Sequence, residues 1–229
     1  MKILKNIMIL PAAGSGKRMG ANMPKQFLAL AGKPLFVHAL EALEAAQSVD
    51  GVVVVMPEND LPLVQELIRS VGFRKVLGVV DGGAARQDSV ANGLSAVPAS
   101  AELIGVHDGV RSLVTPALVD KVIDAAKTHG AAVPCLPVVD TVKTVDGDQI
   151  VQTLDRSTLV RVQTPQVFKA EWLREAYQNA DAEGFTGTDD ASLVERAGHA
   201  VFRVAGEENN IKITTPMDLQ MAHWILETR

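Results

Sequence analysis

Residues 7 to 20 read Ile7-Met8-Ile9-Leu10-Pro11-Ala12-Ala13-Gly14-Ser15-Gly16-Lys17-Arg18-Met19-Gly20. The apolar run over residues 7–10 is typical of a buried strand, and the glycine-rich segment after it places backbone N–H groups at the end of that strand. Glycines let the backbone approach a ligand closely, and Lys17, Arg18 and the nearby Lys25 can neutralise phosphate oxygens. The stretch therefore predicts a polyphosphate-binding loop at the edge of a sheet. The alternative is an ordinary glycine-rich turn with a solvated basic rim.

The spacing excludes two better-known phosphate-binding loops. A Walker A loop needs glycine, four residues and then Gly-Lys-Ser/Thr, whereas Pro11 occupies the first glycine position here and Arg18 follows Lys17. A dinucleotide-binding fingerprint needs Gly-x-Gly-x-x-Gly, whereas Met19 stands at the third glycine position and no acidic residue ends a strand over residues 52–56. The loop belongs to neither class.

The composition is that of an ordinary globular protein. The 229 residues are 47% hydrophobic and carry a formal net charge of −5, which argues against general binding to nucleic acid or to a membrane surface. Residues 1–6 lead into a strand too quickly for a signal peptide. We therefore expect one cytoplasmic domain over residues 1–229, in which the basic residues around Arg18 form a local site for a small anion. The lone Cys135 is predicted to be a buried thiol.

Short apolar runs alternate with helix-like segments as far as residue 137. Thr115-Pro116 predicts the N-cap and the first residue of a helix that ends at Gly130. The alternation predicts an α/β fold with a Rossmann-like, mostly parallel sheet and helices on both faces. The predicted strands cover residues 7–10, 52–56, 75–80, 103–107 and 131–136. Ligands bind at the carboxyl ends of strands in such folds, so the loops over residues 11–25, 81–89 and 108–111 should face one crevice.

A β-hairpin is predicted after the alternating region. Residues 141–145 and 149–153 indicate two strands joined by a two-residue turn at Asp146-Gly147. Since an isolated hairpin is marginally stable in water, we expect a protruding arm over about residues 138–158 that packs on another surface. That surface belongs either to a partner subunit or to the same chain. Further helices are predicted over residues 169–180, from Thr188-Asp189 and from Pro216.

The second and third loops carry polar groups beside the expected crevice. Backbone groups near Gly82 and Gly83, together with the Ser89 hydroxyl, can recognise the edge of a nucleotide base. The alternative is that Asp88 or Ser89 only caps the following helix.

The third loop pairs a carboxylate with a guanidinium. Asp108 can hold a ribose hydroxyl, a substrate hydroxyl or Mg²⁺ through water, and Arg111 can clamp a phosphate. A mutual ion pair between the two is the alternative. Further along, Lys212 alternates with Ile211 and Ile213, so its side chain should point to the side opposite the one that they bury.

The order of these motifs resembles one known enzyme family. The resemblance rests on residues 11–20 with Pro24-Lys25-Gln26-Phe27, Gly82-Gly83 with Arg86-Gln87-Asp88-Ser89-Val90, His107-Asp108-Gly109-Val110-Arg111, Asp140-Thr141, Asp155-Arg156, Thr164-Pro165-Gln166, Thr188-Asp189-Asp190 and Asn210-Ile211-Lys212. Nearly end to end, the chain resembles the 2-C-methyl-D-erythritol 4-phosphate cytidylyltransferases of the non-mevalonate isoprenoid pathway. The resemblance implies a nucleotidyltransferase fold and a homodimer interlocked through the arm. It also implies transfer of a cytidylyl group from CTP to methylerythritol phosphate, with release of pyrophosphate. Mg²⁺ is expected as cofactor, because negative charge builds up on the transferred phosphate and on the departing pyrophosphate.

The resemblance implies a role for each candidate residue. Arg18, Lys25, Arg156 and Lys212 would be catalytic, with Thr141 and Arg156 reaching the substrate from the partner's arm. The nucleotide would be bound by Pro11, Ala12, Ala13, Gly14, Ser15, Gly16, Gly82, Gly83, Ser89 and Gly109, and the alcohol phosphate by Asp108, Arg111, Thr164 and Lys212. No direct side-chain ligand to the metal is expected, Asp108 being the one candidate. Ala84 departs from the acidic residue that some relatives carry, which leaves base recognition to backbone groups, and Ser112 replaces a common proline.

Three other activities stay open at this point. Cytidylyl transfer to ribitol 5-phosphate would use the same loops and differ around Arg111, Thr141 and Arg156. A catalytically silent nucleotide-sensing module would not need both Arg18 and Lys25. A nucleotide hydrolase would need a residue that activates water, whereas a substrate phosphate oxygen is already an anionic nucleophile and needs no strong base.

Overall fold

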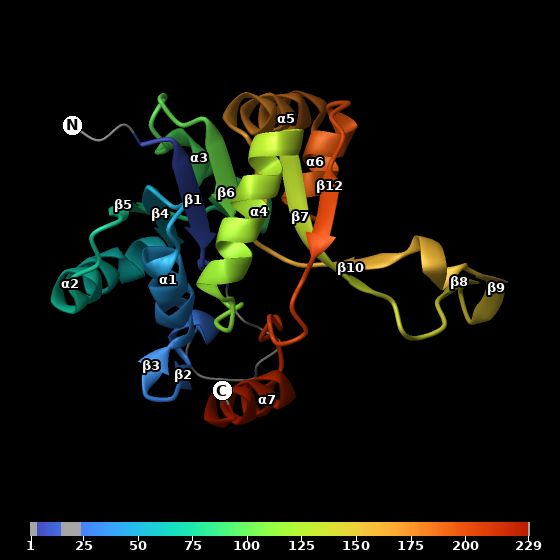
Figure 1. The fold of residues 1–229 in the computed structure, drawn as a ribbon, viewed down its shortest axis with the longest axis horizontal. Coiled ribbons are helices and arrows are strands. Elements are labelled where there is room, and N and C mark those ends of the chain that lie inside the picture. Colours follow the sequence, from blue (N-terminus) through green and yellow to red (C-terminus); the bar gives the residue numbers. More distant parts are fainter. Residues whose placement is uncertain (1–3, 15–23, 229) are drawn as a thin grey trace.

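The computed structural model describes residues 4–14 and 24–228. In this part of the chain, eight strands form one sheet in the order β10-β7-β11-β6-β1-β4-β5, with β12 paired to β7 (Figure 1). The strands are β1 (Asn6–Pro11), β4 (Gly51–Met56), β5 (Val76–Asp81), β6 (Leu103–Val106), β7 (Ala131–Pro137), β10 (Val160–Val162), β11 (Gln166–Lys169) and β12 (Phe202–Ala205). Strands β1, β4, β5, β6, β7 and β12 run in one direction, and β10 and β11 run in the other. The predicted mostly parallel sheet is confirmed.

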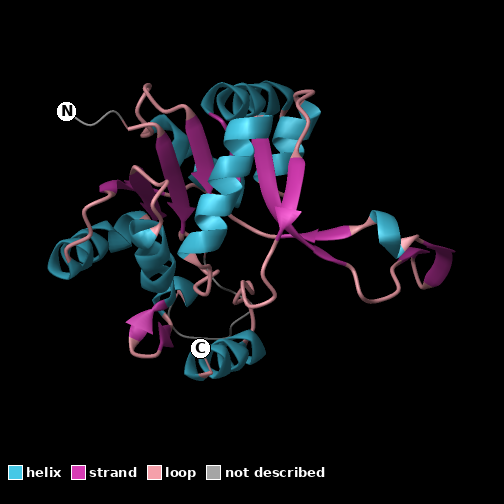
Figure 2. Ribbon diagram, in the orientation of Figure 1, coloured by secondary structure: helices cyan, strands magenta, loops and turns pink. Residues whose placement is uncertain are grey.

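Helices cover both faces of the sheet, as Figure 2 shows. Along β1, Met8 and Leu10 pack into one core cluster with three helices, whereas Ile7 and Ile9 pack into a second cluster with three others. This alternation follows from the two-residue period of a strand, and it explains why β1 is apolar throughout. On the first face lie α1 (Leu35–Ala45), α2 (Leu61–Val71) and α4 (Pro116–His129), and on the second lie α3 (Arg86–Ser95), α5 (Ala170–Glu183) and α6 (Asp190–Arg196).

The predicted ends of α4 are confirmed. The Thr115 hydroxyl accepts a hydrogen bond from the Leu118 N–H at 3.0 Å, and Pro116 is the first helical residue. Gly130 ends the helix with φ of +88°, a conformation that residues with a Cβ rarely adopt.

Two strands of the eight-stranded sheet were not predicted. Strand β11 lies antiparallel between β6 and β7, although its sequence, Gln-Val-Phe-Lys, begins and ends with polar residues. Strand β10 is only three residues long and includes the exposed Arg161. Neither segment carries the apolar run that marks a buried strand.

The predicted hairpin forms an arm that projects from the body of the molecule (Figure 1). Its strands are β8 (Lys143–Asp146) and β9 (Gln149–Thr153), and among the described residues they pair only with each other. The predicted turn position is wrong by one residue: Asp146 pairs with Gln149, so Gly147 and Asp148 form the turn, with Gly147 at φ of +55°. Val145, Ile150 and Val151 are each about 60% exposed on the arm.

A third apolar cluster lies beyond the carboxyl ends of the parallel strands. There α7 (Pro216–Glu227), which begins at the predicted Pro216, packs through Ala222 and Ile225 against the segment around Val110 and Leu113. Strands β2 (Ala29–Leu30) and β3 (Lys33–Pro34) close the same region. Ile213 is fully buried in this cluster, which fixes the chain on either side of it.

Across residues 4–14 and 24–228, none of the helices has the length and the apolar character that spanning a membrane requires.

Candidate active site

Three loops meet at the carboxyl ends of β1, β5 and β6. Each continues the strand pairing past the end of the sheet: Ala12 N–H donates to the Val55 carbonyl at 2.8 Å, Gly82 N–H to the Met56 carbonyl at 2.8 Å, and Gly109 N–H to the Pro11 carbonyl at 3.1 Å. The predicted common crevice is therefore confirmed, and its position follows from the parallel direction of the three strands.

Glycine is required where the second and third loops approach the first. A Cβ on Gly82 would lie 2.4 Å from the Ala13 Cβ, and a Cβ on Gly109 would lie 2.8 Å from the Ala12 Cβ. Both distances are shorter than real Cβ contacts, so any side chain at either position would push the loops apart. These glycines support the pocket from behind, because neither of them lines it.

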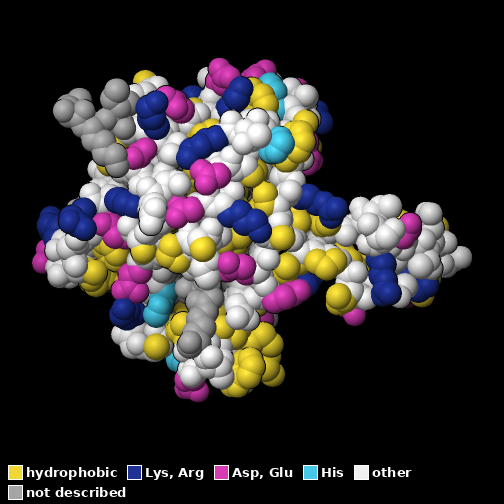
Figure 3. Space-filling view, viewed as in Figure 1, with side chains coloured by type: hydrophobic (Ala, Val, Ile, Leu, Met, Phe, Trp, Pro, Cys, Tyr) yellow, Lys and Arg dark blue, Asp and Glu magenta, His cyan; other side chains and the backbone are white. Residues whose placement is uncertain are grey.

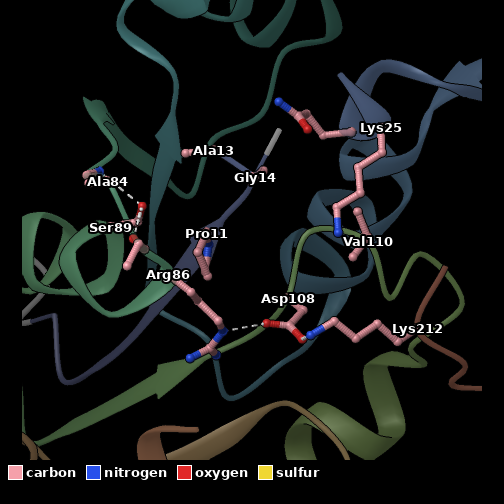
Figure 4. Close-up of a pocket in the computed structure, with 14 residues that line it drawn as sticks. Pro11, Ala13, Gly14, Lys25, Ala84, Arg86, Ser89, Asp108, Val110 and Lys212 are labelled. Atoms are coloured by element: carbon pink, nitrogen blue, oxygen red, sulfur yellow. Dashed lines mark hydrogen bonds and ion pairs between the residues drawn. The ribbon is translucent and has the colours of Figure 1, made fainter. Parts of the chain in front are cut away.

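The loops enclose a cavity of about 240 Å³. Figure 4 shows Lys25 extending from one side toward Val110, with Asp108 and Lys212 below and Ser89 on the opposite wall. The lining residues are Pro11, Ala12, Ala13, Gly14, Lys25, Gln26, Gly83, Ala84, Ala85, Arg86, Ser89, Asp108, Val110 and Lys212. Nine of them are residues that the sequence placed in the site: Pro11, Ala12, Ala13, Gly14, Lys25, Gly83, Ser89, Asp108 and Lys212.

Asp108 is the centre of a charged cluster on the pocket floor. Its carboxylate lies 2.7 Å from the Lys212 ammonium and 3.1 Å from Nε of Arg86, while Nε of Arg111 is 3.9 Å away. Arg86 also donates to Asp190, whose carboxylate is fully buried, at 2.7 Å. Thus the principal partners of Asp108 are Arg86 and Lys212, rather than its loop neighbour Arg111.

The charge of this cluster is fixed over the physiological range. Burial disfavours ionisation of the Asp108 carboxyl, but Arg86, Lys212 and Arg111 outweigh it and hold the pKa of Asp108 well below its ordinary value. Burial likewise opposes the charge on Arg86, yet the carboxylates of Asp190 and Asp108 raise its pKa above the ordinary value. Three cations therefore face two carboxylates, which leaves the floor with a net positive charge toward a bound anion.

His107 and Thr164 hold the Asp108 backbone from behind. Nε2 of His107 lies 3.2 Å from the Arg111 carbonyl, which can only accept, so this nitrogen carries the proton. Nδ1 then accepts from the Thr164 hydroxyl at 3.0 Å, and that hydroxyl accepts from the Asp108 N–H at 3.1 Å. Burial lowers the pKa of His107 to about 4, so the ring is neutral near pH 7. It is a packed structural histidine with both nitrogens engaged.

Ser89 shapes the wall formed by the second loop. Its hydroxyl donates to the Ala85 carbonyl and accepts from the Gly83 N–H, each at 3.0 Å. The expected alternative of an Asp88 or Ser89 N-cap is wrong, because Ala85 occupies the N-cap position of α3 and the Asp88 carboxylate reaches back to the Ala85 N–H at 2.9 Å. Ser89 keeps one acceptor lone pair free for a ligand.

Known proteins resemble this chain over almost its whole length. The family model for 2-C-methyl-D-erythritol 4-phosphate cytidylyltransferase matches residues 6–228. The enzyme of that name from Geotalea uraniireducens is 45% identical over 96% of both chains, and the one from Geobacillus thermodenitrificans is also 45% identical over 96% of both. The chain belongs to this family.

Solved structures of cytidylyltransferases show the same fold. The crystal structure of 4-diphosphocytidyl-2C-methyl-D-erythritol synthase from Anaerococcus prevotii matches with a TM-score of 0.87 at 29% identity, over 98% of this chain and 96% of that one. The cytidylyltransferase from Thermus thermophilus matches with a TM-score of 0.78 at 36% identity, over 99% of this chain and all of that one. The predicted nucleotidyltransferase fold is confirmed, and the chain is a nucleotidyltransferase enzyme.

Several predicted site residues lie outside the cavity of this cytidylyltransferase. Thr164 is buried behind the floor, and Arg111 is nearly buried there, with Nη1 donating to the Asn210 carbonyl at 2.8 Å. Thr141 and Arg156 are exposed on the arm, which projects from the body of the molecule (Figure 1), and neither residue lines the pocket. Ser15, Gly16 and Arg18, like Lys17, lie outside the described residues.

Two polar residues that line the pocket of the cytidylyltransferase, Arg86 and Gln26, had no role assigned from the sequence. Arg86 stands in the Arg86-Gln87-Asp88-Ser89-Val90 motif. It bonds to Asp108 and Asp190, which lie 22 and 104 residues further along the chain, so only the fold brings the three side chains together. Gln26 follows Lys25 directly and is fully buried. Its burial depends on tertiary packing, so its residue type alone carried no signal.

The carboxylate of Asp108 is a poor candidate for direct metal ligation. Its oxygens already face the ammonium of Lys212 and Nε of Arg86. Within segments 4–14 and 24–228, no three His, Cys, Asp or Glu side chains gather in a way that could hold a metal ion. Mg²⁺ commonly keeps several waters and binds through substrate phosphates, and a pocket with one pre-engaged carboxylate fits that mode.

Proposed function

We propose that this chain transfers the cytidylyl group of CTP to 2-C-methyl-D-erythritol 4-phosphate, giving 4-diphosphocytidyl-2-C-methyl-D-erythritol and pyrophosphate. The relatives at 45% identity carry this activity in their names. The observation that carries the proposal is the arrangement of the pocket (Figure 4). Lys25 and the Asp108–Lys212 pair line the same cavity, and the rest of its wall is largely main chain.

The nucleotide base belongs on the wall formed by the second loop. Gly83, Ala84 and Ala85 present backbone groups there, and Ser89 fixes their course through its two hydrogen bonds. A base is distinguished by the hydrogen-bonding groups of its edge, and a site that pairs with those groups rejects a base that leaves them unpaired. Since Ala84 has no polar side chain, base selection in this chain rests on the main chain.

The phosphates belong over the first loop. A Cβ on Gly14 would lie 3.6 Å from Cε of Lys25, which shows that the Lys25 side chain passes directly over this loop. An ammonium at this place stabilises the charge that develops on the α-phosphate and on the departing pyrophosphate. Arg18, to which the sequence assigned the same role, lies outside the described residues. Removal of a comparable cation lowers phosphoryl transfer by about 10³-fold or more.

The acceptor phosphate belongs on the floor beside Asp108 and Lys212. One of its oxygens attacks the α-phosphorus of CTP, a new P–O bond forms, and the bond to the β-phosphate oxygen breaks. No proton needs to move, because the nucleophile is already an anion. The neutral, fully engaged His107 is consistent with a site that does its chemistry through charge and position.

Mg²⁺ is proposed as the cofactor, held by the phosphates of CTP. When bound, it neutralises phosphate charge during transfer. Lys25, Lys212 and Arg86 surround the same space and add to that neutralisation.

A homodimer is proposed as the working form, with the arm of one chain over the pocket of the other. The arm carries Thr141 and Arg156, and its apolar side chains Val145, Ile150 and Val151 are exposed to solvent in a single chain. Met217, Met221 and Trp224 form a second exposed apolar strip along α7, visible as yellow surface in Figure 3. Apolar strips of this kind mark interaction surfaces, and a second copy of the chain would cover both.

A cytoplasmic location is proposed, in keeping with the net charge of −5 and the single cysteine, which has no partner for a disulfide within the chain. The partners are CTP and the polyol phosphate rather than nucleic acid or a membrane.

The substrate assignment is tested by pyrophosphate release. With CTP and Mg²⁺, release should require methylerythritol phosphate, and chelation of Mg²⁺ by excess EDTA should abolish it. Ribitol 5-phosphate and a sugar 1-phosphate serve as the competing acceptors, and ATP, GTP and UTP as the competing nucleotides. Faster release with ribitol 5-phosphate would overturn the acceptor assignment.

A further inference from the structure

Gln26 is a buried amide without a hydrogen-bond partner. Its side chain is fully buried, and neither Oε1 nor Nε2 bonds to any described residue. It nevertheless lines the 240 Å³ cavity, one residue after Lys25 in the short helical turn Lys25–Phe27. Gln26 thus lies at the pocket wall with the hydrogen-bonding capacity of both ends of its amide unused.

The other buried glutamines of the site region are satisfied. Nε2 of Gln166 donates to Asp189 at 2.7 Å, and its Oε1 accepts from the Ala191 N–H at 3.0 Å. Gln163 bonds through both ends to the backbone around Glu207 and Asn210. Buried polar groups in native proteins are nearly always paired, and an unpaired one calls for an explanation such as a bound ligand. Gln26 is therefore a candidate to bond a ligand that enters the pocket.

The position of Gln26 indicates that its partner is a phosphate of the nucleotide rather than the base. Lys25 precedes it and passes over the first loop at Gly14, whereas the base wall is built from Gly83 to Ser89 on a different loop. A phosphate oxygen only accepts hydrogen bonds, and the NH₂ group of an amide supplies two donors without adding charge. Hydrogen bonds from a neutral donor to an anion are among the stronger ones in proteins.

We infer that Gln26 is a nucleotide-binding residue whose side-chain amide donates to a phosphate oxygen of the CTP triphosphate. This inference rests on the proposed function for the identity of the nucleotide. A glutamine with this role differs from an ordinary structural glutamine in its effect on stability. Without nucleotide, the unpaired buried amide lowers the stability of the folded chain. With nucleotide bound, the same amide is hydrogen-bonded.

The test replaces Gln26 by methionine, which has a similar volume and no donor. Without ligand, Gln26→Met should raise the melting temperature by about 2–6 °C, because the variant no longer buries an unpaired amide. The dissociation constant for CTP, measured by calorimetry without the acceptor alcohol, should rise about tenfold or more. Binding of cytidine, which lacks phosphates, should change less than about twofold.

The matched control replaces Gln166 by methionine. Its amide is bonded at both ends within the protein, so Gln166→Met should lower the melting temperature of the unliganded chain. A second variant, Gln26→Glu, keeps the shape and the acceptors but loses the donors, and it should weaken CTP binding at least as much as methionine does.

Three results would overturn the inference: a lower melting temperature for Gln26→Met, a CTP affinity within about twofold of the parent chain, or an equal loss for cytidine. Because binding is measured without the acceptor, these outcomes are independent of the acceptor assignment. If the parent chain binds a different nucleotide instead, the proposed function fails, and the same comparison is made with that nucleotide and its nucleoside.

Discussion

A single threonine hydroxyl connects the buried histidine to the pocket floor. The Thr164 oxygen receives the Asp108 N–H and gives its own proton to Nδ1 of His107. A proton added to Nδ1 would place a charge in a fully buried ring close to the Arg111 guanidinium, and the Thr164 hydroxyl would have to turn its own proton away from Nδ1. The hydrogen bonds around the ring are those of its neutral form, and protonation of His107 therefore opposes folding in acid.

This effect of protonation can be measured. The pKa of His107 is about 4 in the folded chain, against about 6.5 for histidine in an unfolded one. The unfolded chain thus binds more protons between these values, and stability falls as the pH decreases from about 6.5 to about 4. From pH 7.5 to pH 5, His107 should account for a loss of about 2 kcal/mol in the free energy of unfolding. Urea unfolding of His107→Gln should show a pH dependence that is smaller by that amount.

The same experiment contains its control. Between pH 7.5 and pH 9 the ring is neutral in both states, so the parent chain and His107→Gln should change in parallel. An undiminished loss of stability between pH 7.5 and pH 5 in the variant would contradict the role of the ring.

At the scale of elements, the pocket depends on how closely three loops approach one another. A Cβ at position 109 would meet the Ala12 Cβ at 2.8 Å and the Pro11 carbonyl at 3.2 Å, and neither atom is the end of a flexible side chain. The third loop carries Asp108, so any displacement of the loop moves the centre of the charged floor. Small displacements matter in sites that work through positioning.

Gly109→Ala should therefore impair catalysis more than folding. We expect kcat/KM to fall at least about 10²-fold and the free energy of unfolding to fall by about 1–3 kcal/mol. Gly78 offers a matched control on β5, because a Cβ there meets no atom within 4 Å. Gly78→Ala should leave kcat/KM unchanged. Parent-like kinetics in Gly109→Ala would show that the loops tolerate separation.

At the scale of the whole molecule, the arm determines whether one chain holds a complete site. Lys25 lies in the pocket and Arg156 on the projecting arm. If the arm reaches the neighbouring pocket, a mixed dimer of Lys25→Ala and Arg156→Ala chains has one site with both residues intact. Random mixing of the two inactive variants should then restore about a quarter of the parent activity.

The control for this mixing experiment uses two residues of one pocket. Lys25 and Lys212 come from the same chain, so Lys25→Ala mixed with Lys212→Ala should restore nothing. No recovery in the first mixture would mean that each site is built from one chain, and size-exclusion chromatography with light scattering would then decide whether the dimer exists.

The parts predicted from the sequence are those that local pattern controls. The apolar runs of β1 and β4, the Thr115 cap and the position of the arm follow from spacing and residue type. Strand β11 could not be predicted in this way, because it has only four residues and the polar Gln166 and Lys169 at its ends leave no apolar run. The turn was placed one residue early because Asp146-Gly147 and Gly147-Asp148 are both good turn pairs, and only the pairing of Asp146 with Gln149 decides between them.

Within the site, residue types predicted many of the residues that line the pocket but not which side chains pair with one another. Asp108 and Lys212 were assigned to the pocket, yet their ion pair joins residues far apart in the sequence. Arg86 and Gln26 were not predicted for the same reason. The ion pairs of Arg86 and the buried, unpaired amide of Gln26 exist only in the folded chain. The reaction could be predicted from the family resemblance, whereas the contacts between the pocket side chains depend on tertiary packing.

The wall of the pocket from Ala12 to Gly14 and from Gly83 to Ala85 is largely main chain. A single mutation exchanges a side chain and leaves the peptide groups in place, and at Gly82, Gly83 or Gly109 it adds an atom for which there is no room. An inhibitor that bonds to these peptide groups, rather than to neighbouring side chains, would therefore leave the enzyme few routes to resistance by mutation. Substitutions that expelled such a compound would also expel the natural nucleotide.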